Sequence, residues 1–194
     1  MNIGAGRVVY QDLVRVNKAV QEKELDSNPV LLNALAYAKK NNKSVHFIGL
    51  VSDGGVHSHI DHLKGLVTIA HDRGISDLFI HAFMDGRDTD PKGGLDYLKQ
   101  VIAHLKVTSG QVATVIGRYY AMDRDKRWER VKLAYDVMVN DIDEKTSDPL
   151  DTIQKSYDNN VTDEFLKPIV VVDRNQKPVA TIKEGDLVLC FNFR

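Results

Sequence analysis

Residues 44–51, SVHFIGLV, form an apolar run of strand length that ends in the polar loop SDGGVHSH, residues 52–59. Two later runs repeat this arrangement: residues 78–84 lead into Asp85-Gly86-Arg87-Asp88, and residues 111–116 lead into an arginine-rich loop. Because helical patterns separate the three runs, we expect parallel strands whose carboxyl ends meet at one edge of a sheet. Open α/β sheets bind their ligands at this edge. The arginines and the histidine in these loops indicate a compact, highly charged anion.

The whole pattern predicts a single domain, residues 1–194, of the α/β class. We expect three layers, α/β/α, with a mostly parallel central sheet and helices on both faces. A turn at Asp173–Pro178 precedes a short strand-like run, Val179–Ile182, which predicts an antiparallel extension of the sheet. A last strand is expected at Leu187–Phe193. A helix at 125–139 should pack through four apolar side chains at helical spacing: Trp128, Val131, Tyr135 and Met138.

Composition argues against several classes of function. The apolar fraction is 43%, enough for a sizeable core, and the net charge of −1 gives no overall attraction to nucleic acid or to a membrane surface. No apolar run approaches the ~20 residues that span a bilayer. The single cysteine, Cys190, lies in an apolar run, where we expect it to be buried, and it cannot form an internal disulfide. A cytoplasmic protein is therefore expected.

Both ends of the sequence look interrupted. The chain starts in a glycine-bearing stretch, Met1–Arg7, and it stops on Arg194 directly after a strand-like run. Core strands seldom finish without a following loop, so we expect a domain excised from, or inserted in, a longer protein. A natural chain with docked termini is the alternative.

The loop after the first strand can be interpreted in two ways. His57, His59, Asp61 and His62 are close in sequence and are of residue types that bind zinc or manganese, which needs three or four converging ligands. However, His57 and His59 are two residues apart where a helix begins, and such side chains point apart. Alternatively, His57 faces the crevice at the strand ends and hydrogen-bonds an anion beside the amides of the helix start. His59 and His62 are then surface or capping residues.

The Asp85-Gly86-Arg87-Asp88 loop places a cation beside two carboxylates. One interpretation is a structural ion pair that braces the loop. The other is a functional arginine, Arg87, that binds a phosphate or carboxylate through paired hydrogen bonds, with Asp88 oriented toward a substrate hydroxyl. A carboxylate near an arginine stays ionised, so Asp88 could accept a hydrogen bond or a proton.

The third loop has the densest positive charge. Arg118, Arg124 and Arg127 lie within ten residues, together with Lys126 and nearby aromatic side chains. Single-stranded nucleic acid is one ligand of such loops, but acidic residues are interleaved here and would repel a phosphate backbone. A small ligand fits alternating charge better. Arg118 and Arg124 are therefore the site candidates, whereas Arg127 and Arg130 are expected to be salt-bridged surface residues.

No nucleophile signature accompanies these groups. The sequence contains no Gly-x-Ser-x-Gly elbow, no Gly-x-x-x-x-Gly-Lys-Ser/Thr loop and no Gly-x-Gly-x-x-Gly after a strand. The chain thus has groups that can bind an anion, without obvious bond-breaking machinery.

At these same residues the chain closely resembles the cofactor-independent (2,3-bisphosphoglycerate-independent) phosphoglycerate mutases. The matching segments span essentially the whole chain; they are NIGAGRVVYQ (2–11), Leu50–His59, His81–Asp88, Gly117–Glu129, Asp163-Glu164-Phe165 and Phe191–Arg194. The family has two domains. One, related to alkaline phosphatases, holds two manganese ions and a serine that is transiently phosphorylated; the other, inserted into it, binds the glycerate. This chain resembles the inserted domain alone, which implies that the nucleophile and the metal ligands lie outside it.

The resemblance also implies a role for each matching residue of the loops. His57 should contact the substrate phosphate. Arg87 and Asp88 should contact the glycerate, with Asp88 as the candidate base for the hydroxyl proton. Arg118 and Arg124 should bind the substrate carboxylate or phosphate.

Arg194 completes the set of substrate-binding candidates. It matches the first arginine of an Arg-x-x-Arg ending, whose second arginine falls beyond the end of this sequence. Asp90 stands where proline is common in the family, and Gly93-Gly94 where a bulkier pair occurs. These departures could loosen the loop, but they leave the binding residues unchanged.

We therefore predict the substrate-binding domain of a phosphoglycerate mutase, an isomerase that interconverts 3-phosphoglycerate and 2-phosphoglycerate in glycolysis and gluconeogenesis through a phosphoserine on the other domain. The expected partners are these phosphoglycerates and the metal-binding domain of the same polypeptide, with no nucleic acid and no membrane. The protein is expected to be a monomer, and this chain alone to be inactive. The alternatives are a stand-alone module that binds phosphorylated metabolites, and a metal-dependent phosphohydrolase that uses the histidines at 57–62.

Overall fold

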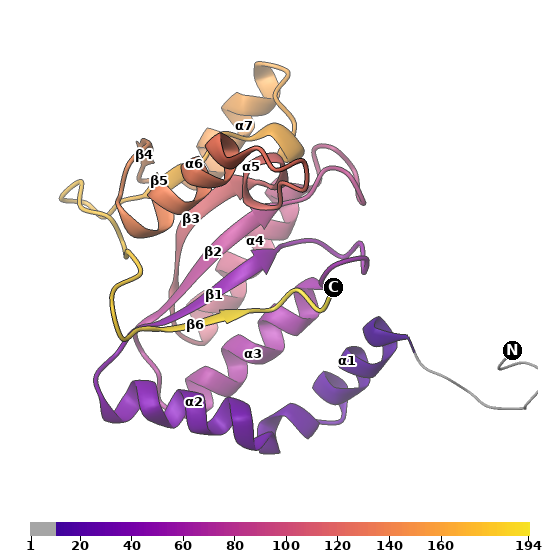
Figure 1. Ribbon diagram of the computed structural model, residues 1–194, viewed down its shortest axis with the longest axis vertical. Helices are drawn as coiled ribbons and strands as arrows, with labels where there is room; N and C mark the ends of the chain where they lie inside the picture. The colour runs from indigo at the N-terminus through magenta and orange to yellow at the C-terminus, as the bar shows by residue number, and fades with distance from the viewer. Residues whose placement is uncertain (1–10) are drawn as a thin grey trace, which may run out of the picture.

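Six strands form one sheet in the computed structural model, which describes residues 11–194 (Figure 1). Their order across the sheet is β4-β5-β3-β2-β1-β6. The strands are β1 Val45–Leu50, β2 Leu78–Met84, β3 Gln111–Gly117, β4 Glu144–Thr146, β5 Ile169–Val171 and β6 Leu187–Cys190. Residues 2–10 of the family-like N-terminal segment lie outside the described residues.

Helices connect the strands, as the periodic patterns predict. They are α1 Asp12–Gln21, α2 Pro29–Lys40, α3 Ile60–Asp72, α4 Gly94–Val107, α5 Arg118–Ala121, α6 Trp128–Val139 and α7 Pro149–Asp158, with the 3-10 turns η2 Glu24–Ser27 and η3 Asp163–Phe165. No helix among residues 11–194 is both long and apolar enough to cross a membrane.

Local sequence explains where two of these helices begin. The Asn28 side chain accepts hydrogen bonds from the amides of Val30 and Leu31, and Pro29 occupies the first turn of α2. Asp148 caps α7 in the same way, again with a proline directly after the cap. Each pair satisfies amides that lack a partner within the helix and presets the backbone for the first turn.

The sheet is parallel except at one edge. β1, β2, β3 and β6 run in the same direction, which confirms the predicted parallel core. β5 runs antiparallel to β3, and β4 runs parallel to β5. The sheet thus has the predicted antiparallel extension, which is formed by β5 and β4.

The predicted strand at Val179–Ile182 is wrong, because these four residues form no strand; the pairing next to them is an isolated bridge between Val172 and Pro178. The Asp173 carboxylate accepts hydrogen bonds from the amides of Asn175 and Lys177 and so tightens the turn. Pro178 follows it and has no N–H with which to extend a ladder.

Two apolar clusters cover opposite faces of the sheet, because successive side chains of a strand point to opposite faces. The larger cluster packs α2, α3, α4 and α7 on residues such as Phe47 and Ile80. The smaller one packs α6 on Leu50, Phe83 and Ile116. This arrangement is the predicted α/β/α layering.

α6 does not pack as the sequence predicts. Trp128 is 73% exposed, and Val131 and Tyr135 are also exposed, whereas Met138 packs partly against the smaller cluster. The buried apolar positions are Ala134 and Val137. Small side chains face the sheet, and the large apolar residues point outward.

Cys190 is exposed, which corrects the prediction that it is buried. It lies in β6, an edge strand whose only partner in the described sheet is β1. Along β6 the side chains alternate between half-buried and exposed, so Val188 and Cys190 share the outer face. An apolar run of sequence therefore became a strand with one face open.

Candidate functional site

The three predicted loops meet at the carboxyl ends of β1, β2 and β3. With the C-terminal segment they enclose a pocket of about 230 Å³. Its lining contains five of the six predicted site residues: His57, Arg87, Arg118, Arg124 and Arg194. The sixth, Asp88, is hydrogen-bonded to Arg118 in its wall. We call this pocket the crevice.

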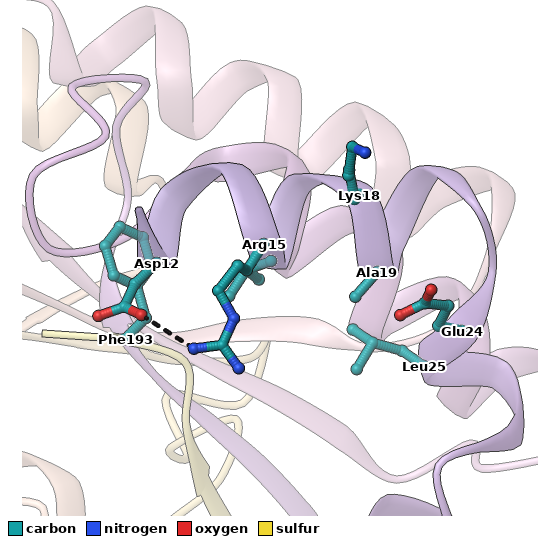
Figure 2. Close-up of a pocket in the computed structure, with 8 residues that line it drawn as sticks. Asp12, Arg15, Lys18, Ala19, Glu24, Leu25 and Phe193 are labelled. Carbon is teal, nitrogen blue, oxygen red and sulfur yellow. Dashed lines mark hydrogen bonds and ion pairs between the residues drawn. The ribbon is translucent and has the colours of Figure 1, made fainter. Parts of the chain in front are cut away.

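A larger hollow, about 540 Å³, lies between α1, η2 and Phe193 (Figure 2). An Arg15–Asp12 ion pair and the apolar side chains of Ala19 and Leu25 line it. It holds none of the predicted site residues and does not lie at the strand ends. Charge and position therefore favour the smaller crevice as the functional site.

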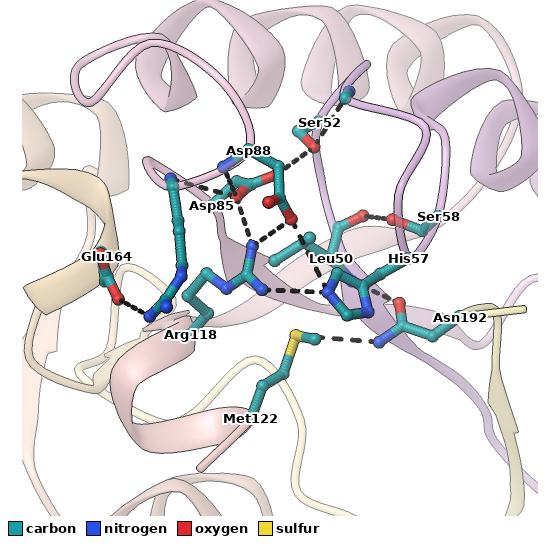
Figure 3. Close-up of polar contacts among 12 residues, drawn as sticks. Leu50, Ser52, His57, Ser58, Asp85, Asp88, Arg118, Met122, Glu164 and Asn192 are labelled. Atoms are coloured by element: carbon teal, nitrogen blue, oxygen red, sulfur yellow. Dashed lines mark hydrogen bonds and ion pairs between the residues drawn. The ribbon is translucent and has the colours of Figure 1, made fainter. Parts of the chain in front are cut away.

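Arg118 is the centre of the crevice (Figure 3). It begins α5 directly after β3, and its side chain is only 10% exposed. One guanidinium nitrogen, Nη1, donates to Asp85 at 2.6 Å and to Asp88 at 2.7 Å. The other, Nη2, lies 3.1 Å from Nε2 of His57. Arg118 thus joins the loops that follow all three central strands.

Asp85 holds the Arg118 guanidinium in place. Its carboxylate is buried and accepts hydrogen bonds from the Ser52 hydroxyl at 2.6 Å and from the amides of Arg87 and Asp88. Burial alone would raise the pKa of Asp85. The hydrogen bonds from the Asp88 amide, Ser52 and Arg118 outweigh burial and lower the pKa below its ordinary value. Asp85 is therefore a stable anion that faces Arg118.

His57 is uncharged at neutral pH. Burial lowers its pKa, and the positive charge of Arg118 lowers it further. Because a guanidinium can only donate, Nε2 of His57 accepts, and the ring proton lies on Nδ1. An Asp88 oxygen lies 3.7 Å from the same Nε2, too far for a hydrogen bond. The neutral ring leaves an Nδ1–H group that can donate to a ligand.

Arg87 pairs outside its own loop. Its Nη1 lies 3.2 Å from the Glu164 carboxylate in η3, and its side chain is 50% exposed. The predicted ion pair that braces the loop exists, but it joins Asp85 to Arg118 rather than to Arg87. Arg87 and Glu164 both line the crevice.

Arg124 and Arg194 differ from the other arginines of the crevice. Both line it, yet neither has a hydrogen bond or an ion pair with any residue in the described range 11–194. An arginine without a carboxylate partner, facing a pocket, is available to bind an anion through paired hydrogen bonds.

The sequence analysis missed one arginine of the crevice. Arg130 is salt-bridged to Asp123 at 3.1 Å, as expected, but it is not a surface residue: it lines the crevice and its guanidinium lies 3.8 Å from the centre of the Tyr119 ring. Arg127 instead forms an exposed ion pair with Glu129, as predicted. No sequence signal distinguishes Arg127 from Arg130. The direction of α6 decides that Arg130, and not Arg127, faces the crevice.

The histidines that follow His57 do not converge on a metal position. His59 caps α3 by accepting from the Asp61 amide, as a capping residue should. His62 is buried rather than exposed; its Nε2 lies 2.6 Å from the Asn17 side-chain oxygen, and burial lowers its pKa to about 4. Within residues 11–194, no group of three or more His, Cys, Asp or Glu side chains could hold a metal ion. The metal-dependent phosphohydrolase alternative thus lacks a ligand set here.

An α/β domain with an arginine-lined crevice at its strand ends has the charge and the shape that suit a small anion. The family model described as BPG-independent PGAM N-terminus matches residues 16–194, and the chain belongs to this family. It thereby falls within the family that its motifs resemble.

Curated relatives agree with this assignment. A 2,3-bisphosphoglycerate-independent phosphoglycerate mutase of Flavobacterium johnsoniae is 55% identical over the whole chain, and one of Bacteroides fragilis is 56% identical. The chain spans 38% of the length of each. A crystal structure of Leishmania mexicana phosphoglycerate mutase at low cobalt concentration superposes with a TM-score of 0.90 at 30% identity, covering 97% of this chain and 36% of that one.

Proposed function

We propose that this chain is the substrate-binding domain of a two-domain phosphoglycerate mutase, an isomerase that interconverts 3-phosphoglycerate and 2-phosphoglycerate. Family membership and the names of the relatives support the reaction. The observation that carries the assignment to this chain is the crevice. There Arg124 and Arg194, which have no partner among residues 11–194, lie beside a fixed group of Arg118, Asp88 and His57.

The geometry suggests how the residues divide the work. Arg124 and Arg194 bind the negatively charged ends of the substrate, its phosphate and carboxylate, and the Nδ1–H of His57 donates to the phosphate. Arg87, on the loop after β2, binds the glycerate. Holding both ends of a small ligand supplies the orientation that phosphoryl transfer needs.

Asp88 is the proposed base for the hydroxyl proton of the glycerate. One of its oxygens is occupied by Arg118 at 2.7 Å, and the other is left to accept the proton. The Arg118 contact fixes the direction of the carboxylate, so that its second oxygen can face the hydroxyl.

The serine that carries the phosphoryl group and two manganese ions are inferred to belong to the rest of the polypeptide. The described residues offer no group that fits a metal ion, so we derive no step through one. This chain binds and orients the substrate, and we expect it to have no mutase activity alone. We also infer a monomer that works in the cytoplasm, in keeping with one cysteine and no internal disulfide.

The test is a titration of the purified chain with 3-phosphoglycerate, followed by NMR chemical shifts. Shifts should cluster at His57, Arg87, Arg118 and Arg124, and Arg124→Ala should remove them. Arg174→Ala is the matched control, because Arg174 is an exposed arginine in the turn before Pro178. An absence of shifts at millimolar ligand, or turnover of 3-phosphoglycerate by the chain alone, would contradict the proposal.

A further inference from the structure

The segment Asp163-Glu164-Phe165 has no role in the account of binding given above. It forms η3, between α7 and β5, and lies beside the loops that follow β2 and β3. The side chains of Asp163 and Glu164 contact the segment that follows β2, which carries Arg87, and that of Phe165 contacts Tyr119 in the segment that follows β3. One turn therefore connects both arginine-bearing loops.

Asp163 clamps the loop that carries Arg87. Its buried carboxylate accepts a hydrogen bond from the Gly94 amide at 2.8 Å, at the start of α4, and another from the Tyr157 hydroxyl. Its own amide donates to the Pro91 carbonyl at 3.0 Å. At Gly86, whose φ is +64°, an added Cβ would lie 2.9 Å from Cβ of Asp163. The loop therefore lies directly against η3 along much of its length.

Glu164 sets the direction of the Arg87 side chain. Its carboxylate is 18% exposed in the crevice wall and meets Nη1 of Arg87 at 3.2 Å. Arg87 is half-exposed and long, so without this contact its side chain would sample many rotamers. With Nη1 held by Glu164, the remaining guanidinium N–H groups can face a ligand.

Phe165 reaches the other arginine-bearing loop through an aromatic contact. Its ring is tilted against that of Tyr119, with the ring centres 5.2 Å apart, and Tyr119 also contacts the Arg130 guanidinium at 3.8 Å. Arg130 in turn pairs with Asp123, which also accepts backbone hydrogen bonds from two residues beyond Arg124. Arg124 thus projects from a short loop whose base is tied to η3.

From these contacts we propose that η3 is a positioning element, in which Glu164 orients Arg87 and Phe165 supports the loop that presents Arg124. Neither residue is assigned contact with the reacting atoms; both act through the arginines. The inference rests on the proposed function, because the arginines are taken to bind a phosphoglycerate. It adds specificity for ligand length, since one turn contacts both Arg87 and the loop that carries Arg124 and so sets the separation of the two arginines.

The experiment compares Glu164→Gln and Phe165→Leu in the full chain, with Glu144→Gln as the matched control. Glu144 is an exposed glutamate of β4. Without ligand, NMR should show faster motion of the Arg87 Nε–H group in Glu164→Gln. Amide hydrogen exchange should be faster at residues 118–127 in Phe165→Leu. The control should change neither signal.

Affinity then separates positioning from simple stability. In Glu164→Gln the Kd for 3-phosphoglycerate should rise about tenfold, the loss expected for one charge-assisted hydrogen bond, with a thermal midpoint lowered no more than in Arg87→Gln. In an Arg87→Gln background, Glu164→Gln should have no further effect on Kd, because its action passes through Arg87. Equal effects in both backgrounds would overturn the assignment of Glu164.

The two proposals fail in different ways. If the unaltered chain does not bind 3-phosphoglycerate, the proposed function is wrong, and the ligand-free NMR signals still decide the role of η3. If the Arg87 and 118–127 signals are unchanged in both variants, η3 is not a positioning element, whatever the affinity of the unaltered chain.

Discussion

The arginines of the crevice fall into two groups that differ in their bonding. In the first, Arg118 is nearly buried and its donors are taken up by Asp85, Asp88 and His57. In the second, Arg124 and Arg194 line the same crevice and have no partner among residues 11–194. We call these the braced side and the open side.

The difference predicts which residues stabilise the fold and which are available to bind a ligand. Burying Arg118 costs solvation, which its two carboxylates and a histidine offset, so the braced side is ordered before any ligand arrives. An exposed arginine such as Arg124 is solvated by water, so the lack of a partner costs little stability and its charge remains available to bind an anion. The braced side should therefore respond to mutation in stability, and the open side in affinity.

The largest effect is expected on the braced side. Arg118→Ala leaves the buried Asp85 without its charge partner, and removing one partner of a buried ion pair should lower the free energy of unfolding by about 3 kcal/mol. Arg124→Ala should change it by less than about 0.5 kcal/mol. Urea unfolding followed by circular dichroism at pH 7 measures both. Similar losses in the two variants would remove the distinction between the sides.

Acid should lower the stability of the fold through a buried histidine, His62, which lies outside the crevice. The pKa of His62 is lowered to about 4, so between that value and its ordinary pKa the unfolded chain binds a proton that the folded chain does not. Stability from this group is present at pH 7 and is lost as pH falls below about 6.5, by about 2 kcal/mol at pH 5. Asp163 acts in the opposite direction, because burial raises its pKa to about 6.

Unfolding curves between pH 5 and 7 test this sign. His62→Gln should flatten the pH dependence, and His57→Gln should flatten it less, since His57 is more exposed. If His57→Gln has the larger effect, the acid response lies in the braced side of the crevice.

Changes on the open side should alter the affinity for the ligand. Arg124→Ala and Arg194→Ala should each raise the Kd for 3-phosphoglycerate about tenfold, since each removes a charge-assisted contact to the ligand. Isothermal titration calorimetry with Arg174→Ala as control would measure this change. Unaltered affinity in both variants would show that the open side does not bind this ligand.

Arg87 is the intermediate case and should have a small effect on stability, between those of Arg118 and Arg124. Its ion pair with Glu164 joins two side chains, one of which is half-exposed, so Arg87→Gln should cost about 0.5 kcal/mol. Thermal unfolding at low and high salt would show this, because salt screens an exposed pair. A loss as large as that of Arg118→Ala would place Arg87 on the braced side.

Sequence reasoning succeeded where the signal was periodic and local. The strands at 45–50, 78–84 and 111–117 lie close to where the patterns predict them. It failed where several apolar side chains of one helix could equally well have been buried. The apolar residues of α6 fit a buried stripe, yet the sheet accepted the smaller Ala134 and Val137 instead.

The same contrast applies to the candidate site. Loops after parallel strands must share an edge, so sequence order alone brings His57, Arg87 and Arg118 together. It does not say which carboxylate pairs with which arginine. That Arg118 takes both Asp85 and Asp88, while Arg87 turns to Glu164 across 77 positions, depends on side-chain directions in three dimensions.

The sequence alone thus determines the α/β class, the parallel order of the central strands and the loops that form the crevice, because these follow from hydrophobic period and connection length. The tertiary structure decides which arginines are neutralised, which stay free, and how η3 joins two loops. Those outcomes depend on distances of a few ångströms between residues far apart in the chain, and charge pairing changes steeply over such distances.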